Sequence, residues 1–238
     1  SRRQRQMCIR DRVDILVTPL VTIGVGATLA ALCAPPLGKL AMQTGTVIMW
    51  ATELQPFLMG ILVSVFVGIA LTLPISSAAI CAALGLTGLA GGAAVAGCSA
   101  QMIGFAVQSY RENGVGGLLS QGLGTSMLQM PNIVRNPRIW IGPIFASAIT
   151  GPLATCVFKL RMDGAAVSSG MGTCGLVGQI GVFTGWISDM AAGTKAAITS
   201  FDWLGLLFIS FVLPAILSPI INQGCCRLGW VKNGDMKL

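Results

Sequence analysis

Residues 54–110 read LQPFLMGILVSVFVGIALTLPISSAAICAALGLTGLAGGAAVAGCSAQMIGFAVQSY and contain no aspartate, glutamate, lysine or arginine. A bilayer core needs about 20 apolar residues per helical span, so this stretch has room for two spans and a connection. Soluble domains carry roughly 25% charged residues. This chain has 10% charged and 54% hydrophobic residues, and the composition therefore predicts a polytopic membrane protein.

The rest of the chain repeats this pattern. We expect an all-α transmembrane helical bundle of about five spans, with one or two re-entrant or broken segments. The spans are predicted at Val13–Cys33, Phe57–Leu73, Ala93–Tyr110, Ile139–Phe158 and Trp203–Ile221. Between the first two spans, Ala34–Pro56 is predicted to be an amphipathic or interfacial stretch.

Two segments are too rich in proline or glycine to form ordinary spans. Pro74–Gly92 is predicted to be a half-helix or a re-entrant turn, because irregular backbone at membrane depth survives only inside protein or beside a wet cavity. Gly164–Ile187 interleaves glycines with Ser, Thr and Gln. Two interpretations of it stay open: close helix packing through small residues, or a re-entrant hairpin that lines a substrate path.

Basic residues predict the orientation in the membrane. If Gly164–Ile187 is re-entrant, one side carries seven basic residues and the other carries three, which are Lys159, Arg161 and Lys195. The side with seven holds Lys39, Arg111, Arg135, Arg138, Arg227, Lys232 and Lys237. The positive-inside rule then predicts a cytoplasmic carboxyl terminus.

Residues 1–12, SRRQRQMCIRDR, hold five of the fifteen basic residues. They resemble translated sequencing-adapter sequence, and we expect them not to belong to the natural protein; the alternative is a basic tail that binds anionic lipid. Without them ten basic and seven acidic side chains remain, a balance of +3, which argues against a nucleic-acid-binding protein. The predicted domains are a membrane domain over 13–226, incomplete at its amino terminus, and a short polar tail over 227–238.

The sequence offers few residues for metal or nucleophilic chemistry. It contains no histidine and no CxxC pair, and most of its eight cysteines are scattered in apolar runs. Glycine pairs such as Gly122 and Gly124 follow no strand, so they do not indicate a nucleotide site. We therefore predict no metal, no cofactor and no catalytic residue of the chain's own.

A lone carboxylate precedes the longest apolar run. Glu53 and Gln55 lie in the sequence TELQP, and an ionisable group at membrane depth is a functional candidate because its burial is costly. Such a carboxylate can accept hydrogen bonds from two sugar hydroxyls, or bind a proton. The alternative is that Glu53 lies among the lipid headgroups and is simply solvated.

The stretch QGLGTSMLQMPNIVRNP, from Gln121 to Pro137, is rich in neutral hydrogen-bonding groups. Amides and hydroxyls suit a sugar or polyol, so we predict that this stretch binds substrate. The alternative is a loop whose polar side chains satisfy its own backbone. The predicted binding residues are Glu53, Gln55, Gln121, Thr125, Ser126, Gln129, Asn132 and, in the glycine-rich segment, Gln179.

Three segments together resemble a known family. They are SAQMIGFAVQSYREN (99–113), GGLLSQGLGTSMLQMPNIVRNPRIWIGP (116–143) and SSGMGTCGLVGQIG (168–181). They are similar to the membrane component IIC of the bacterial sugar phosphotransferase system, in the type 2 branch that includes perfringolysin-regulator-like proteins. The resemblance covers most of Val13–Trp186.

The resemblance implies a sugar permease in the bacterial cytoplasmic membrane, which is usually a homodimer. Its partners would be a sugar or polyol and the IIB and IIA components. IIB would supply the phosphoryl group, so any enzymatic activity would belong to a phosphohistidine–sugar phosphotransferase complex. The chain would bind the sugar, orient one hydroxyl towards IIB and alternate access. Two other functions stay open, a membrane sensor that keeps the scaffold without transport and an ion-coupled secondary carrier.

Overall fold

A computed structural model describes residues 42–193, 197–232 and 234–238, with isolated positions between 21 and 39. The chain divides into two units, Ser1–Gln43 and Thr44–Leu238, and all features discussed below lie in the second. Residues 1–12 and the predicted span Val13–Cys33 fall outside the described residues, apart from those isolated positions.

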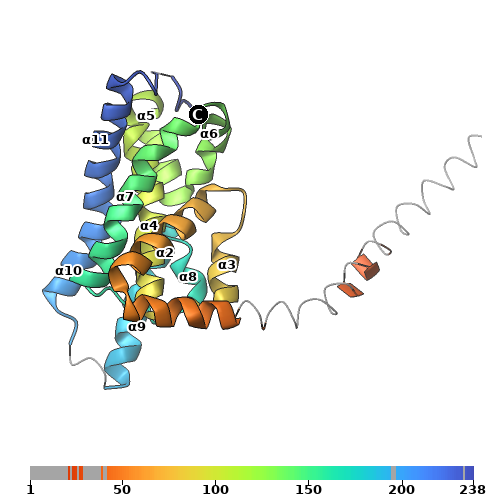
Figure 1. Ribbon diagram of the computed structural model, residues 1–238, viewed down its shortest axis with the longest axis vertical. Helices are drawn as coiled ribbons and strands as arrows, with labels where there is room; N and C mark the ends of the chain where they lie inside the picture. Colours follow the sequence, from red (N-terminus) through yellow and green to blue (C-terminus); the bar gives the residue numbers. More distant parts are fainter. Residues whose placement is uncertain are drawn as a thin grey trace, which may run out of the picture. The chain divides into compact units, whose positions relative to one another are not determined.

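Every regular element in the described ranges is a helix (Figure 1), which confirms the predicted all-α class. In chain order the elements are a helix over residues 44–54, α2 (Pro56–Thr72), α3 (Ser77–Leu84), α4 (Gly88–Gln108), α5 (Tyr110–Leu119), η1 (Ser120–Gly124), η2 (Ser126–Gln129), α6 (Met130–Arg135), η3 (Pro137–Trp140), α7 (Ile141–Pro152), η4 (Leu153–Val157), α8 (Ala166–Ser169), η5 (Cys174–Leu176), α9 (Val177–Ala191), α10 (Ser200–Leu207), η6 (Phe208–Val212) and α11 (Leu213–Arg227).

Three helices in the described residues are long and apolar enough to cross a membrane. They are Gly88–Gln108, Pro137–Val157 and Ser200–Arg227. The last two run through a turn of π-helix, η4 directly after Pro152 and η6 shortly before Pro214, because proline lacks the N–H that an α-helix needs. Together with the shorter α2, these helices match four of the predicted spans.

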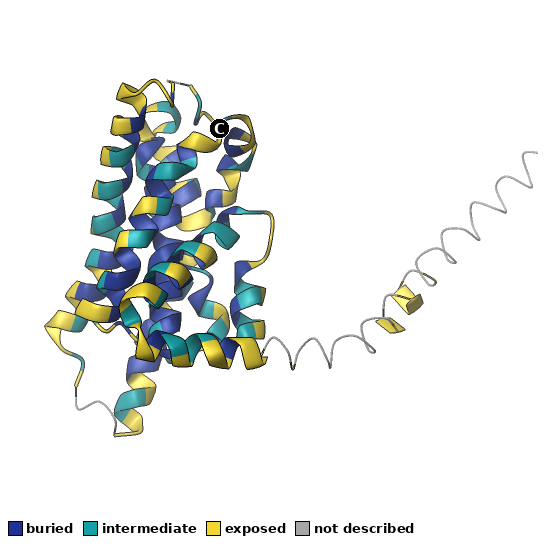
Figure 2. Cartoon of the chain, in the orientation of Figure 1, coloured by how far each residue is buried: buried dark blue, intermediate teal, exposed yellow. Residues whose placement is uncertain are grey.

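Helix α4 forms the centre of the bundle, with α2, α7 and α11 packed around it (Figure 1). Figure 2 shows α4 buried along most of its length while the outer helices expose one face. Small residues permit this packing: α2 carries Gly60, Ser64 and Gly68 at intervals of four, so they share one face of the helix. A Cβ added to Gly97 of α4 would lie 1.9 Å from the carbonyl oxygen of Ser64. No larger residue fits this contact.

Two ends of the bundle can be defined by their residues. We call one the linker end, formed by the connection 158–163 and by the neighbouring ends of α9 and α10. The other is the clasp end, formed by α5, α6 and the segment 228–238. In Figure 1 these lie at the bottom and the top of the view.

Three broken segments reach into the bundle from these ends. The hairpin α2–α3 starts and finishes at the linker end, since Thr155 binds the Pro56 carbonyl and Gly88 pairs with Met162. The glycine-rich segment does the same: its two ends, at Asp163 and Asp189, line one cavity. The third segment runs from α5 to α6 and starts and finishes at the clasp end.

The glycine-rich segment therefore turns back instead of spanning. It contains two helices, α8 and α9, separated by turns in which Gly172 and Gly175 adopt positive φ angles of 55° and 52°. Close packing through small residues occurs in the same segment, because a Cβ on Gly181 would lie 2.5 Å from the Cβ of Ser168. The segment thus combines close packing with a turn back into the bundle, and the substrate path stays a prediction.

Candidate functional site

The inner turns of the three broken segments meet beside the middle of α4. We call this place the tip junction and define it by the turns 72–77, 122–126 and 170–173. A hydroxyl group ties each turn to another. Thr72 Oγ1 and Ser126 Oγ are 3.0 Å apart, Ser77 Oγ donates to the Gly170 carbonyl at 2.7 Å, and Thr173 Oγ1 donates to the Gly122 carbonyl at 2.7 Å.

Helix α4 adds buried polar groups to this place. Gln101 is fully buried, and its Oε1 accepts hydrogen bonds from Trp140 Nε1 at 2.9 Å and from Thr72 Oγ1 at 3.4 Å. Its Nε2 donates to Ser147 Oγ at 3.4 Å. Because both ends of the amide are paired, Gln101 positions its neighbours and links α2, α4, η3 and α7.

Gln179 differs from Gln101, because half of its amide lacks a partner. Its Nε2 donates to Ser99 Oγ of α4 at 3.2 Å, while its Oε1 has no hydrogen-bond partner among the described residues, although the side chain is only 8% exposed. A buried acceptor left unpaired costs about 1–3 kcal/mol. Other buried atoms of this kind belong to Gln108, Ser210, Ser218 and Asn222 on α4, η6 and α11, outside the broken segments.

Backbone conformation brings Gln179 to α4. Gly172 has a φ of +55°, and a Cβ there would lie 2.6 Å from the Cβ of Cys98 and 2.8 Å from the backbone nitrogen of Ser99. Only glycine permits both this φ and this approach. The first turn of α9 therefore starts directly against α4, with Gln179 facing Ser99.

The predicted binding residues occupy three separate places. Ser126 belongs to the tip junction, and Gln179 lies next to it in the first turn of α9, where the backbone nitrogen of Gly178 donates to the Gly172 carbonyl at 3.0 Å. Gln121, Gln129 and Asn132 lie towards the clasp end. Thr125 belongs to the turn 122–126, and its hydroxyl caps η2 by accepting a hydrogen bond from the backbone nitrogen of Met127. Glu53 and Gln55 are exposed at the linker end.

Sequence reasoning missed five polar residues of the junction, namely Thr72, Ser77, Ser99, Gln101 and Thr173. Four of them lie inside or beside uncharged runs that were interpreted as membrane span or as a break, and Thr173 lies in the glycine-rich segment, for which a hairpin that lines a substrate path was one of two interpretations. The signal available was a hydroxyl or amide group in an apolar run near a proline or glycine break. Such a residue must find a partner inside the protein.

The amides at the clasp end bind the protein's own backbone. Gln121 Oε1 accepts from Gln129 Nε2 at 3.0 Å, and the same Nε2 donates to the Met236 carbonyl at 3.0 Å. Asn132 Nδ2 donates to the Lys237 carbonyl at 3.0 Å. Gln129 and Asn132, two of the residues predicted to bind a sugar, therefore hold the segment 228–238, and Gln121 supports Gln129.

Glu112 of α5 supplies a carboxylate that binds the backbone of this segment. Its two oxygens accept hydrogen bonds from the backbone nitrogens of Gly234 at 2.8 Å and Met236 at 3.0 Å. Replacing Glu112 by glutamine turns one acceptor into a donor, so we expect a loss of about 1–3 kcal/mol and faster proteolysis within 228–238.

The measurement is limited proteolysis together with thermal unfolding of the purified protein in detergent. Glu53→Gln is the matched control, because the carboxylate of Glu53 is 60% exposed and lies 3.9 Å from Arg161, a contact worth less than about 1 kcal/mol. Equal sensitivity of the two variants to protease would contradict the role of Glu112.

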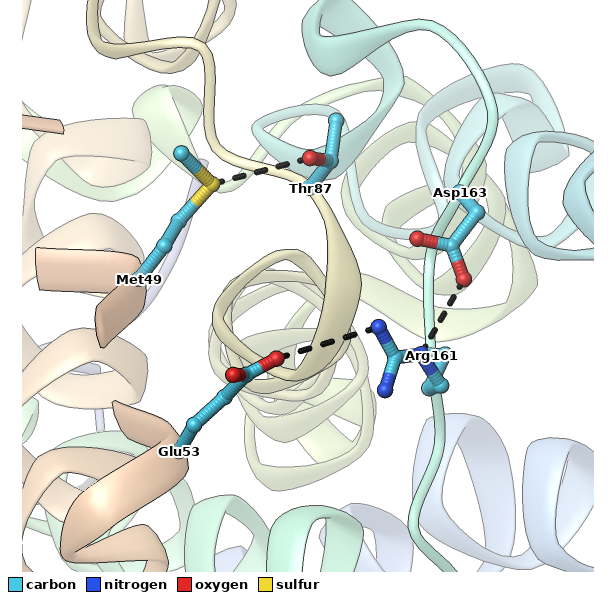
Figure 3. A network of polar contacts seen from close by, with 5 residues as sticks. All are labelled: Met49, Glu53, Thr87, Arg161 and Asp163. Atoms are coloured by element: carbon cyan, nitrogen blue, oxygen red, sulfur yellow. Dashed lines mark hydrogen bonds and ion pairs between the residues drawn. The ribbon is translucent and has the colours of Figure 1, made fainter. Parts of the chain in front are cut away.

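The linker end carries a cluster of charged side chains (Figure 3). Arg161 lies between two carboxylates: its Nη2 is 3.9 Å from Glu53 and its Nε is 3.3 Å from Asp163. Beside this cluster is a cavity of about 450 Å³ with Lys159, Arg161, Asp163, Trp186, Asp189 and Asp202 in its lining. Within the described residues, no group of histidine, cysteine, aspartate and glutamate side chains could hold a metal ion.

Comparisons with known proteins place the chain in a family. A family model described as phosphotransferase system, EIIC, matches residues 6–238. Comparisons with curated proteins and with solved structures gave no match. The family match agrees with the resemblance found in the sequence, and together with the apolar helices it shows a membrane protein. The chain belongs to the EIIC family of phosphotransferase system membrane components.

Proposed function

We propose that this chain is the sugar permease subunit of a phosphoenolpyruvate-dependent phosphotransferase system, and that the tip junction binds the sugar. One observation carries the proposal: three broken segments meet inside an apolar bundle, and a buried acceptor there, Gln179 Oε1, lacks a partner among the described residues. Irregular backbone within a transmembrane bundle typically marks a transport site.

The chemistry of the junction suits a sugar. Each sugar hydroxyl is both donor and acceptor, as are the hydroxyls of Thr72, Ser77, Ser126 and Thr173. Sugar hydroxyls can therefore take the place of the hydroxyl partners in the three hydrogen bonds between the turns. A further sugar hydroxyl can donate a hydrogen bond to Gln179 Oε1. The structure then corresponds to a closed junction, which opens when hydroxyls of the substrate exchange with hydroxyls of the protein.

The chain's own residues do not supply a phosphoryl carrier of the histidine type, since the sequence has none. We assign the phosphoryl donor to a separate IIB component, charged by IIA. The permease would hold the sugar with one hydroxyl directed at that donor, and proximity would then lower the barrier to transfer.

We place the protein in the bacterial cytoplasmic membrane with the clasp end in the cytoplasm, and we keep the homodimer as a prediction. Charge supports the orientation, because the basic residues described within Thr44–Leu238 gather at the clasp end. Two of them, Lys159 and Arg161, belong to the linker end. The other six, all at the clasp end, are Arg111, Arg135, Arg138, Arg227, Lys232 and Lys237.

The test is transport by membrane vesicles that contain this protein and receive the soluble phosphorelay components. We expect sugar phosphate to accumulate inside only when phosphoenolpyruvate is supplied, and to be unaffected by an uncoupler. Uptake that needs no phosphoenolpyruvate and collapses with an uncoupler would indicate an ion-coupled carrier. Sugar binding without any accumulation would indicate a sensor.

A further inference from the structure

We propose that the cavity at the linker end is a second binding site, specific for an uncharged sugar or polyol and closed to the phosphorylated product. The proposal rests on the proposed function for the identity of the substrate. It concerns a place separate from the tip junction, formed by the connection 158–163, α9 and the start of α10.

The size of the cavity suits a small polar ligand. Its volume is about 450 Å³, within the range of about 300–1,000 Å³ in which small-molecule sites fall. Phe158 and Leu160 add apolar surface next to the charged side chains. Aromatic and apolar surface with convergent polar groups is the usual composition of such a site.

The charges in the lining select against ions of either sign. Lys159 and Arg161 are cationic, while Asp163, Asp189 and Asp202 are anionic, so the lining has a balance of −1. A phosphate ester would meet three carboxylates against the two cations, so the balance of −1 disfavours its negative charge, and a cation would meet an ammonium and a guanidinium group. A neutral sugar meets neither penalty, because its hydroxyls can donate to the carboxylates and accept from the two cations.

The cationic side chains lie where a ligand can reach them. The side chain of Arg161 is 50% exposed, and its contacts with Glu53 and Asp163 are long, at 3.9 and 3.3 Å. The exposed pair of Arg161 with Glu53 contributes little to stability, so a ligand can replace it at low cost. Figure 3 shows the Arg161 guanidinium directed between the two carboxylates.

The backbone at Lys159 supports a built site. Lys159 has a φ of +45°, in the left-handed region that non-glycine residues seldom adopt. Backbone strain of this kind is held in place by the surrounding structure and clusters at functional sites. Here the flanking residue Leu160 is fixed by a hydrogen bond from its backbone nitrogen to the Ala154 carbonyl at 2.8 Å.

One segment connects this cavity with the tip junction. The glycine-rich segment leaves the cavity at Asp163, places Thr173 and Gln179 at the junction and returns to the cavity at Asp189. A sugar in the cavity therefore contacts both ends of the segment whose inner turn closes the junction. In this proposal the cavity binds the substrate first and does not bind its phosphate ester.

The experiment measures sugar binding to the purified protein in nanodiscs without any phosphoryl donor. Glucose, galactose, mannitol and glucose 6-phosphate are the probes, and isothermal titration calorimetry is the readout. The protein carries Gln179→Leu, which disables the junction and isolates the cavity. We expect saturable binding of a sugar that the wild-type protein also binds, and at least tenfold weaker binding of glucose 6-phosphate.

Two further variants locate this binding. Adding Arg161→Gln or, separately, Asp163→Asn to Gln179→Leu should weaken it at least tenfold, while Gln223→Leu on the exposed face of α11 should leave it unchanged. Thermal unfolding of each variant checks that it is folded. The proposal is overturned if the Gln179→Leu protein binds none of the sugars bound by the wild type, or binds glucose 6-phosphate equally well.

The outcome separates this proposal from the proposed function. One outcome is that wild-type vesicles show phosphoenolpyruvate-dependent uptake while the Gln179→Leu protein binds no sugar. This outcome excludes the cavity as a binding site and supports the permease function. Saturable binding by that variant without any such uptake supports the cavity site and removes the phosphotransferase function.

Discussion

Gly97→Ala is expected to destabilise the protein by on the order of 3 kcal/mol, a large loss for one added methyl group. The Cβ of alanine would lie 1.9 Å from the carbonyl oxygen of Ser64 and 2.5 Å from its carbonyl carbon. Neither atom can rotate away, because both belong to the backbone of α2. The whole helix must shift, and the small-residue contact of α2 with α4 and α7 is lost.

Gly116→Ala is the matched control. Gly116 lies in α5, and a Cβ there would have no other atom within 4 Å. Alanine is favoured over glycine in a helix by roughly 0.5–1 kcal/mol, so this variant should be slightly more stable than the wild type. Thermal unfolding in detergent, followed by size-exclusion chromatography, measures both effects. Similar unfolding temperatures for the two variants would contradict the close packing at Gly97.

Gln179→Leu is expected to reduce phosphoenolpyruvate-dependent sugar accumulation by about 100-fold. The sugar hydroxyl that would donate to Gln179 Oε1 then has no acceptor in a buried site, which weakens binding strongly. The same variant should unfold at a temperature close to that of the wild type. Leucine resembles glutamine in size; it removes a buried acceptor without a partner, which stabilises, and also the hydrogen bond to the buried hydroxyl of Ser99, which destabilises, so the two effects offset each other. Loss of activity without loss of stability is the expected combination.

Gln223→Leu serves as the control for this prediction. Gln223 is exposed on α11, so Gln223→Leu replaces the same type of side chain at a position away from the junction. We expect its transport to match the wild type within about twofold, as for other surface changes. Normal transport by Gln179→Leu would exclude Gln179 as a sugar ligand. A large drop in its unfolding temperature would instead make it a packing residue.

Much of the fold follows from local sequence signals. Charge-free runs predicted the spans that correspond to α2, α4, α7 and α11, because burying charge in a bilayer is costly. Proline and glycine predicted the break after Pro74 and the glycine-rich segment, because they interrupt helices through their own backbone properties. These signals need no knowledge of which segments meet.

The site depends on contacts between distant segments, which local signals do not contain. Gln129 and Met236 are 107 positions apart, and nothing near Gln129 indicates that a backbone carbonyl from the end of the chain will meet it. The inference that the amides bind a hydrogen-bonding partner was sound as chemistry. In the structure their partner is a peptide segment, and the assignment of a sugar to them stays a prediction.

The polar residues of α4 could not be recognised from the sequence for a different reason. Nearly every side of this helix is buried, so Ser99 and Gln101 lie in a run without amphipathic periodicity. Their role becomes visible only when Trp140 and Gln179 approach from η3 and α9. A central helix surrounded by protein conceals its functional residues from periodicity arguments.

The most direct measurement is a structure of the protein with a bound sugar, determined by electron cryomicroscopy with a sugar that the vesicles accumulate. We expect density for the sugar at the tip junction, within about 3 Å of Gln179 Oε1, with the turns at Thr72, Ser126 and Thr173 moved apart. The sugar could instead lie beside Gln129 and Asn132, or only in the cavity, while the junction stays closed. In a transport-competent sample, this result would contradict sugar binding at the tip junction.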